Sequence, residues 1–289
     1  MIETVTAPAV TPPMSALPRG ACDCHMHVFG PFDAFPPPDE PSYALPDTNP
    51  TLHLTTLDRL GLDRAILIQP SPYQTDHRAL LHALANSPDR LRGIGSCDAE
   101  TSGETLQALR RAGIIGLRFV EMKAKDGGRY PGTQGLDSFD RLAADMRTHH
   151  MHAQLWADAA SCADAAQRMA KQGMTLVLDH LAGLGPEDLP GSRNFDRIAE
   201  ALDSGLLWIK LTYFRKSARP LDYGDMRPVV AALAEARPDR LLWGSDWPFV
   251  RMDGEQPDAG RLIGQLREWI GEDAFIRVVR DNPAMLFGW

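Results

Sequence analysis

The sequence lacks the features that would place the chain in a membrane or in an oxidising compartment. Its 289 residues include only four cysteines, too few for a disulfide scaffold at this length. Cys22 and Cys24 do not have the Cys-x-x-Cys spacing of a zinc ribbon or a redox pair, so reduced, buried thiols are expected. No run of about 18 apolar residues is present, and residues 1–19 lack the basic start and apolar core of a signal peptide. These absences predict a cytoplasmic protein without a membrane partner.

Positive charge is also scarce, since 30 Lys and Arg residues stand against 38 Asp and Glu residues, for a formal charge of −8. No basic block stands out, so nucleic acid is not expected as a partner. A few arginines inside a pocket can still reverse the local field, which keeps an anionic small molecule compatible with this composition. The sequence leaves open whether the chain forms a homo-oligomer.

The chain divides into an irregular start and one long patterned region. Residues 1–20 contain four prolines, which exclude a helix and predict a flexible arm, either disordered or wrapped in an extended form. Residues 21–289 are long enough, at 44% hydrophobic content for the whole chain, to bury one large core as a single domain. Residues 28–49 are rich in proline and aromatic side chains, and a loop of this length is usually functional. We expect this loop to fold over the site.

Eight short apolar runs alternate with helical patterns. The expected strands span 21–27, 64–69, 91–98, 114–121, 152–158, 175–180, 207–213 and 240–247. The expected helices span 51–60, 76–86, 103–112, 136–149, 159–172, 194–203, 223–236, 258–269 and 273–287. The strand runs are continuous rather than alternating, as expected for parallel strands covered by helices. Eight repeats without a Gly-x-Gly-x-x-Gly turn predict an α/β fold, the closed (β/α)8 TIM barrel, rather than an open doubly wound sheet.

Chemistry-bearing residues follow the ends of these strands, where barrel enzymes place their active sites. Because side chains alternate along a strand, Asp23, His25 and His27 are expected to share one face. His180 ends the sixth expected strand, and Asp246 ends the eighth. Three imidazoles and one carboxylate are therefore predicted to meet at one mouth of the barrel. The structural alternatives are packed core histidines and an aspartate that only serves a turn.

These residues lie in motifs that resemble the amidohydrolase superfamily. The motifs are Asp23-Cys24-His25-Met26-His27, Asp179-His180 and Trp243-Gly244-Ser245-Asp246-Trp247-Pro248. Within the superfamily, the chain is most similar to the amidohydrolase-2 branch, which includes 2-pyrone-4,6-dicarboxylate lactonases and sugar lactonases. Further matches are Gln69-Pro70-Ser71, Gly116-Leu117-Arg118-Phe119 and Asn282-Pro283. The resemblance covers about residues 20–287.

The resemblance implies an enzyme that hydrolyses a lactone, a cyclic carboxylic ester, in the breakdown of aromatic or sugar acids. Asp246 would be the general base that takes a proton from the attacking water. His25, His27 and His180 would polarise the carbonyl oxygen or stabilise the oxyanion, directly or through a metal.

Four residues are predicted to bind the substrate: Tyr43, Ser71, Arg118 and Arg215. The first three match pocket positions that hold carboxylates in the pyrone lactonases, and Arg215 is expected to be a second carboxylate clamp because its planar fork suits a carboxylate. The ordinary counter-charge for Arg118 would be Glu121 or Asp98. The chain departs from the pyrone lactonases at Ala124, where they carry arginine, so a lactone with a smaller anionic load is an equal candidate.

The metal content stays open at this stage. His25, His27, His180 and Asp246 form a ligand set suited to one zinc or manganese ion. The fifth expected strand offers Gln154 and no lysine for carbamylation, so a binuclear centre is not expected. Members of this branch are known that act without metal, which leaves either one divalent ion or none.

Three other functions compete with lactone hydrolysis. The amidohydrolase-2 branch also includes nonoxidative decarboxylases, which need a tightly bound metal and release carbon dioxide. Lactone isomerisation would use a hydroxyl of the substrate as the nucleophile instead of water. A barrel without enzymatic activity is the remaining alternative, because a fold alone does not determine a function.

Overall fold

A computed structural model gives the structure of the chain and describes residues 3–39, 41, 43–252 and 254–289. Eight parallel strands form one sheet in the spatial order β10-β9-β8-β7-β6-β5-β4-β2. Their bounds are β2 (Cys22–Met26), β4 (Arg64–Ile68), β5 (Leu91–Gly95), β6 (Ile114–Val120), β7 (His152–Trp156), β8 (Leu176–Leu178), β9 (Leu207–Lys210) and β10 (Leu241–Leu242). Each expected strand is found, so the local hydrophobic pattern located all eight.

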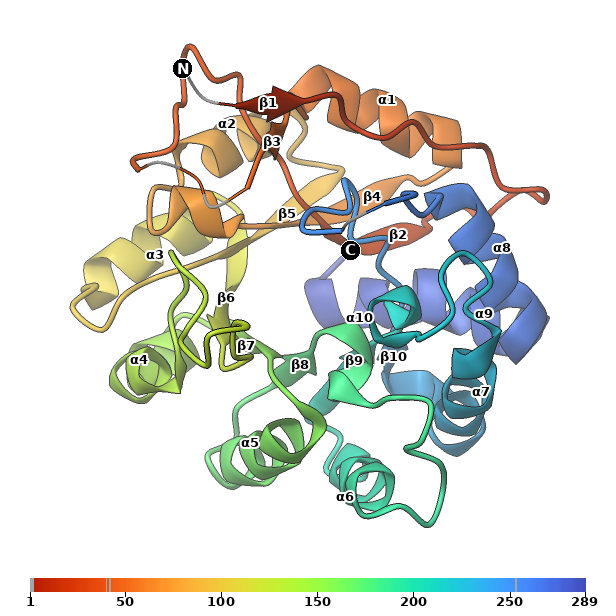
Figure 1. The fold of residues 1–289 in the computed structure, drawn as a ribbon. Helices are drawn as coiled ribbons and strands as arrows, with labels where there is room; N and C mark the ends of the chain where they lie inside the picture. The colour runs from red at the N-terminus through yellow and green to blue at the C-terminus, as the bar shows by residue number, and fades with distance from the viewer. Residues whose placement is uncertain (1–2, 40, 42, 253) are drawn as a thin grey trace.

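The sheet closes on itself between its first and last strands. Cys24 N donates to Trp243 O over 2.9 Å, Asp246 N donates to His25 O over 2.8 Å, and His27 N donates to Trp247 O over 3.0 Å. These bonds join β2 to the segment that follows β10, so the ring has no open edge there. The predicted (β/α)8 barrel is therefore confirmed (Figure 1).

Helices surround the strands (Figure 1). Their bounds are α1 (Pro50–Leu60), α2 (Arg78–Asn86), α3 (Gly103–Arg111), α4 (Leu136–Thr148), α5 (Ala159–Lys171), α6 (Arg193–Leu202), α7 (Arg227–Ala236), α8 (Ala259–Ile270), α9 (Glu272–Ile276) and α10 (Asn282–Phe287). Five begin where a side chain accepts a hydrogen bond from the first turn, namely at Asn49, Ser102, Asp158, Ser192 and Asp258. Within the described part of the chain, none of the helices has the length and apolar character needed to cross a membrane.

Several expected elements are shorter in the structure, and two differ most from the prediction. The last strand shrinks from 240–247 to two residues, because the backbone beyond Leu242 turns through the left-handed region at Asp246 (φ 56°). The expected helix over 273–287 is interrupted by a π-helical turn, Arg277–Asp281. Pro283 has no N–H to continue the regular bonding there, and the Asn282 side chain donates to backbone carbonyls near β10 instead.

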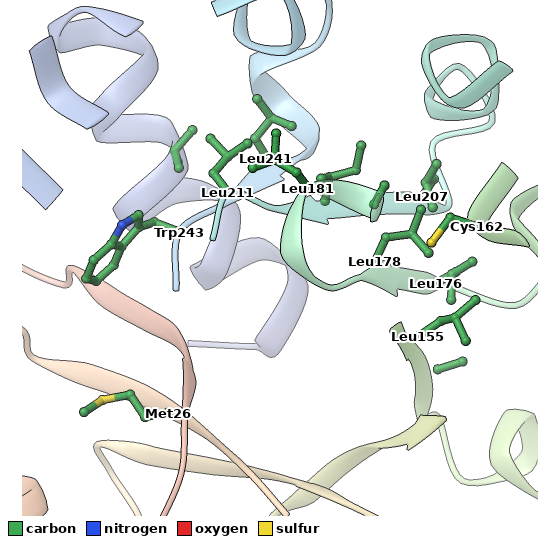
Figure 2. Close-up of a cluster of buried hydrophobic side chains, with 14 of the residues drawn as sticks. Met26, Leu155, Cys162, Leu176, Leu178, Leu181, Leu207, Leu211, Leu241 and Trp243 are labelled. Carbon is green, nitrogen blue, oxygen red and sulfur yellow. The ribbon is translucent and has the colours of Figure 1, made fainter. Parts of the chain in front are cut away.

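Two apolar clusters pack against opposite sides of the barrel sheet. On β4, Ala65 and Leu67 belong to the larger cluster, whereas Ile66 and Ile68 belong to the smaller one. Because successive strand residues face opposite sides, one cluster lies under the helices and the other lies inside the barrel. Figure 2 shows part of the larger cluster, in which strand residues such as Leu155 and Leu178 face Cys162 of α5. The inner cluster forms the floor beneath the polar residues at the strand ends.

The arm takes the extended course that its prolines allow. Its short strand β1 (Thr4–Val5) pairs in parallel with β3 (Leu45–Pro46), which lies in the long loop after β2. Further along, Pro8 O accepts a hydrogen bond of 2.9 Å from the indole of Trp247, the residue after Asp246. The arm therefore contacts both the loop above the barrel and the segment that carries the carboxylate.

Candidate active site

A cavity of about 320 Å³ opens at the C-terminal ends of the barrel strands. Seven of the eight predicted site residues line it, namely His27, Tyr43, Ser71, Arg118, His180, Arg215 and Asp246. The eighth, His25, is fully buried, and its Nε2 lies 3.4 Å from Asp246 Oδ1. A larger groove of about 1100 Å³ lies between the arm and α8, and none of the predicted residues lines it. The structure thus brings the predicted residues together in the smaller cavity.

The carboxylate of Asp246 is the meeting point of the site. Its Oδ1 lies 3.2 Å from His27 Nε2 and 3.4 Å from His25 Nε2. Its Oδ2 accepts a hydrogen bond of 2.5 Å from Arg215 Nε. Only about 3% of its side chain is exposed, so these groups take the place of water around the charge. The left-handed backbone at Asp246 is the kind of local strain that is common at functional sites.

His27 has a defined tautomer when it is neutral. Its Nδ1 lies 3.0 Å from Ile68 O, and a carbonyl can only accept, so Nδ1 carries the proton. The lone pair on Nε2 then faces the carboxylate oxygen of Asp246 at 3.2 Å. Two acceptors at this distance repel each other unless a proton or a cation lies between them. His27 and Asp246 together are therefore suited to bind a proton or a cation at the floor of the cavity.

His180 enters the site from a turn rather than from a regular strand. β8 ends at Leu178, and His180, Leu181 and Ala182 all have positive φ, between 47° and 57°. Non-glycine residues rarely adopt this conformation, and three in succession mark a strained segment. The turn places the imidazole with its ring centroid 5.1 Å from that of His25. Trp156 of β7 meets the His180 ring edge-on at 5.7 Å and also lines the cavity.

The alternation expected along the first strand is interrupted. The register between β2 and β4 shifts between Asp23 and Met26, as at a β-bulge. Asp23 Oδ1 accepts from the backbone N–H groups of His25 and Ser245, at 3.0 and 2.9 Å. Asp23 therefore ties the backbone of β2 to the segment after β10, while His25 and His27 carry the imidazoles.

A buried charge network lies below the cavity floor. Asp179 Oδ2 accepts from Arg118 Nε over 2.8 Å, and Asp179 Oδ1 lies 3.0 Å from Lys210 Nζ. The expectation that Glu121 or Asp98 neutralises Arg118 is thus wrong. Glu121 instead accepts from the backbone N–H that begins α4. Barrel closure decides this pairing, because Asp179 is 61 residues away in sequence.

The protonation states of the site follow from burial and these charges. Burial alone would raise the pKa of Asp246, but Arg215 and the neighbouring imidazoles of His25 and His180 hold it well below its usual range. Burial lowers the pKa of His180 to about 4. Burial and the charge of Lys210 hold the pKa of His25 well below its usual value. At neutral pH the site therefore contains an ionised carboxylate beside neutral His25 and His180.

The predicted substrate-binding residues form one wall and part of the roof. Ser71 begins a short helical turn after β4, and Tyr43 comes from the long loop after β2. Burial raises the pKa of Tyr43 to about 12, so its hydroxyl stays protonated and can donate to a substrate. Arg215 already donates to Asp246 and, over 2.9 Å, to Val250 O. Its carboxylate-clamp role stays a prediction, and its contacts in this structure support Asp246.

The donor set fits a single divalent ion. One donor atom each from His25, His180 and Asp246 lie within 4.8 Å of one another. Among the described residues, His25 Nε2 and His180 Nδ1 are buried atoms without a hydrogen-bond partner. Imidazole nitrogen and carboxylate oxygen are the ligands that zinc or manganese takes. His27, the fourth residue of the predicted ligand set, is not part of this group, although its Nε2 lies 3.2 Å from Asp246 Oδ1.

The sequence did not predict a role for several residues at the site. Lys210 ends β9 and is fully buried, with Nζ 2.6 Å from Gln154 Oε1 and 3.1 Å from His25 Nδ1. A lysine inside an apolar strand run is a usable signal, because lysine is almost never fully buried without partners. Tyr130 and Arg251 also line the cavity, with the guanidinium 4.9 Å over the ring. They come from loops after β6 and β10, where hydrophobic periodicity gives no register.

Comparisons with known proteins agree with this geometry. The family model for amidohydrolases matches residues 22–289. The chain is 30% identical to a 4-sulfomuconolactone hydrolase of Rhizobium radiobacter, over 94% of this chain and 91% of that one. It is 27% identical to a 2-pyrone-4,6-dicarboxylate hydrolase of Comamonas testosteroni, over 95% and 92% of the two chains.

Two further relatives extend the comparison. A D-galactarolactone isomerase of Agrobacterium fabrum is 28% identical, over 99% of this chain and 97% of that one. A crystal structure from Agrobacterium tumefaciens superposes with a TM-score of 0.82 at 27% identity, covering 96% of this chain and 97% of that one. The matches span the whole barrel, including the strand ends that carry the site. The protein therefore belongs to the amidohydrolase family.

Proposed function

We propose that this protein hydrolyses the lactone of a small anionic metabolite. Water attacks the ring carbonyl and Asp246 accepts a proton of that water. The bond between the carbonyl carbon and the ring oxygen then breaks, the ring oxygen takes the proton back from Asp246, and a single hydroxy acid with a new carboxylate is formed. The observation that carries the proposal is the carboxylate of Asp246, ionised at the floor of a cavity and surrounded by imidazoles. A general base must be unprotonated and close to the water it activates, and Asp246 meets the first condition at neutral pH.

The imidazoles supply the complementary polar groups. His25 and His27 lie within 3.4 Å of Asp246 Oδ1, and the His180 ring lies beside that of His25. These rings border the space next to Asp246 in which the carbonyl oxygen of a lactone would gain negative charge as water adds. Hydrogen-bond donors placed at that point in a buried site stabilise the oxyanion more than water would. A divalent ion held by His25, His180 and Asp246 would need a lone pair on the ligating nitrogen of His25, and it would supply Lewis-acid polarisation of the same carbonyl when bound.

The walls favour an anionic substrate of modest size. Arg118, Arg215 and Lys216 line the cavity, and Asp246 is the only acidic residue among the described lining residues. A volume of about 320 Å³ lies at the lower end of the range for small-molecule sites. Arg118 leans over the Trp156 ring at 5.5 Å, which directs one positive group and one flat apolar face toward the same space. A monocyclic lactone with a carboxylate or sulfonate substituent fits these features.

The relatives support lactone chemistry but divide over its outcome. One is named as a lactone hydrolase, one as a 2-pyrone dicarboxylate hydrolase and one as a lactone isomerase. Isomerisation is therefore the second candidate, with a substrate hydroxyl in place of water. The metal-dependent decarboxylase is a third outcome, for which the three clustered ligand atoms are the supporting observation.

One experiment separates these outcomes. A panel of lactone acids is incubated with the protein in water enriched in oxygen-18, and the masses of the products are measured by mass spectrometry. Hydrolysis adds one labelled oxygen to the new carboxylate, isomerisation adds none, and decarboxylation releases carbon dioxide. We expect one labelled oxygen, and an unlabelled rearranged lactone would overturn the proposal.

Replacement of Asp246 tests the general base, and replacement of a second aspartate is the matched control. Asp246→Asn should lower kcat by about 10²–10⁴, the usual contribution of a general base. Asp89→Asn removes an exposed aspartate in the connection between α2 and β5, at the other end of the barrel from the site, and should leave kcat unchanged. Repeating both assays after dialysis against a chelator shows whether turnover needs a divalent ion.

A further inference from the structure

Lys210 is the buried group whose contacts the proposed chemistry does not yet use. It ends β9, its side chain is fully buried, and its Nζ faces three acceptors: Gln154 Oε1 at 2.6 Å, Asp179 Oδ1 at 3.0 Å and His25 Nδ1 at 3.1 Å. An ammonium group has three N–H donors and no acceptor. Two of these contacts are hydrogen bonds, with Gln154 and His25, and the third is an ion pair with Asp179.

This arrangement decides which ring nitrogen of His25 carries the proton. If Lys210 donates to Nδ1, that nitrogen contributes a lone pair, and the proton of the neutral ring must be on Nε2. The alternative is a proton on Nδ1 donated to Asp179 Oδ1, which lies 3.3 Å away. The hydrogen bond with Lys210 is the shorter contact at 3.1 Å, and Asp179 already receives positive charge from Lys210 and Arg118.

With Lys210 as the donor to His25 Nδ1, the two histidines of the His-x-His motif take opposite tautomers. Ile68 O requires the proton of neutral His27 on Nδ1, which leaves its Nε2 free to accept or to bind a cation. Lys210 places the proton of His25 on Nε2, directed at Asp246 Oδ1 over 3.4 Å. A protonated Nε2 is a hydrogen-bond donor and has no lone pair for a metal.

We propose that Lys210 is a positioning residue that holds His25 with its proton on Nε2, which makes His25 an N–H donor at the reacting carbonyl and a poor metal ligand. The carbonyl part of this inference rests on the proposed lactone chemistry, whereas the tautomer does not. Replacement of Lys210 frees Nδ1 to donate to Asp179, and the lone pair then moves to Nε2. Lys210 therefore selects between a donor site and a metal-binding site built from the same imidazole.

The primary test is nitrogen-15 NMR of histidine-labelled protein after chelator treatment, with the His25 signals assigned from a His25→Gln variant. In the wild-type protein we expect the proton of His25 on Nε2, and in Lys210→Met we expect it on Nδ1. Gln154→Met is the matched control, because it removes another acceptor of the same ammonium group and should leave the tautomer unchanged. A proton on Nδ1 in the wild type, or the same tautomer in Lys210→Met, overturns the proposal.

Two further measurements follow the consequences. Lys210→Met should lower kcat by about 10²–10³ with little change in KM, the effect expected when one oxyanion donor is removed. Its affinity for added zinc, measured by calorimetry, should rise about 10- to 100-fold, the size that outer contacts have at metal sites. Zinc binding that is unchanged or weaker than in the wild type refutes the metal part. The tautomer of the wild-type protein is measured without turnover. The tautomer proposal can therefore be refuted while lactone hydrolysis is confirmed, and lactone hydrolysis can be refuted while the tautomer proposal is confirmed.

Discussion

Replacement of Arg215 by methionine tests how the site keeps a buried carboxylate ionised. Arg215 Nε lies 2.5 Å from Asp246 Oδ2, and the two side chains are 18% and 3% exposed. Two unit charges about 4 Å apart attract each other by about 4 kcal/mol at an effective dielectric constant of about 20. That free energy equals about three pKa units. Arg215→Met should therefore raise the pKa of Asp246 by up to about three units.

The sign of the effect on stability follows from linkage. The folded-state pKa of Asp246 lies below its usual value, so the carboxylate stabilises the fold above that value and loses this contribution as the pH falls. In Arg215→Met this contribution shrinks at neutral pH. We expect the free energy of unfolding, measured with urea at pH 8, to fall by up to about 4 kcal/mol. The acid limb of kcat/KM should move upward by a similar number of pH units.

The neighbouring cation provides the control. Lys216 lines the same cavity, but Asp246 receives its ion pair from Arg215. Lys216→Met should leave the acid limb where it is in the wild type and change only KM for an anionic lactone. If Arg215→Met instead raises KM without moving the acid limb, Arg215 is the substrate clamp that the sequence predicted, and the electrostatic reasoning is refuted.

Two further substitutions test the packing and the buried charge around His25. A Cβ on Gly244 would lie 2.6 Å from His25 Cβ, so Gly244→Ala should lower the free energy of unfolding by about 1–3 kcal/mol and should also lower kcat. A Cβ on Gly264 in α8 would meet no described atom within 4 Å, so Gly264→Ala should lower neither the stability nor kcat. Burial raises the pKa of Asp23 to about 7, above its ordinary 3.8, so the fold should lose up to about 4 kcal/mol as the pH rises from about 4 to about 7. Asp23→Asn should abolish that slope in urea titrations at several pH values, and an unchanged slope would contradict the assignment.

The barrel itself could be predicted because its signal is local. Each strand is a short apolar run and each helix carries its own pattern and often its own cap, so the eight repeats were visible without any tertiary contact. The positions of His25, His27, His180 and Asp246 followed from the same pattern, since parallel strands in a barrel end at one rim. The strand expected at 240–247 and the helix expected at 273–287 were predicted too long. Asp246 and Pro283 interrupt the regular backbone hydrogen bonding in these two segments.

The sequence by itself determined which strand-end residues reach the mouth of the barrel, because strand ends are properties of the local pattern. It did not determine the loop residues Tyr130 and Arg251, which also line the cavity. Only the tertiary structure decided what those residues contact. Asp179 rather than Glu121 neutralises Arg118, Arg215 binds Asp246, and Lys210 reaches His25 across 185 residues of sequence. These pairings depend on register, on the bulge in β2 and on the closure of the ring. Hydrophobic periodicity contains no information about them, because it reports which face of an element is buried and not which charges meet there.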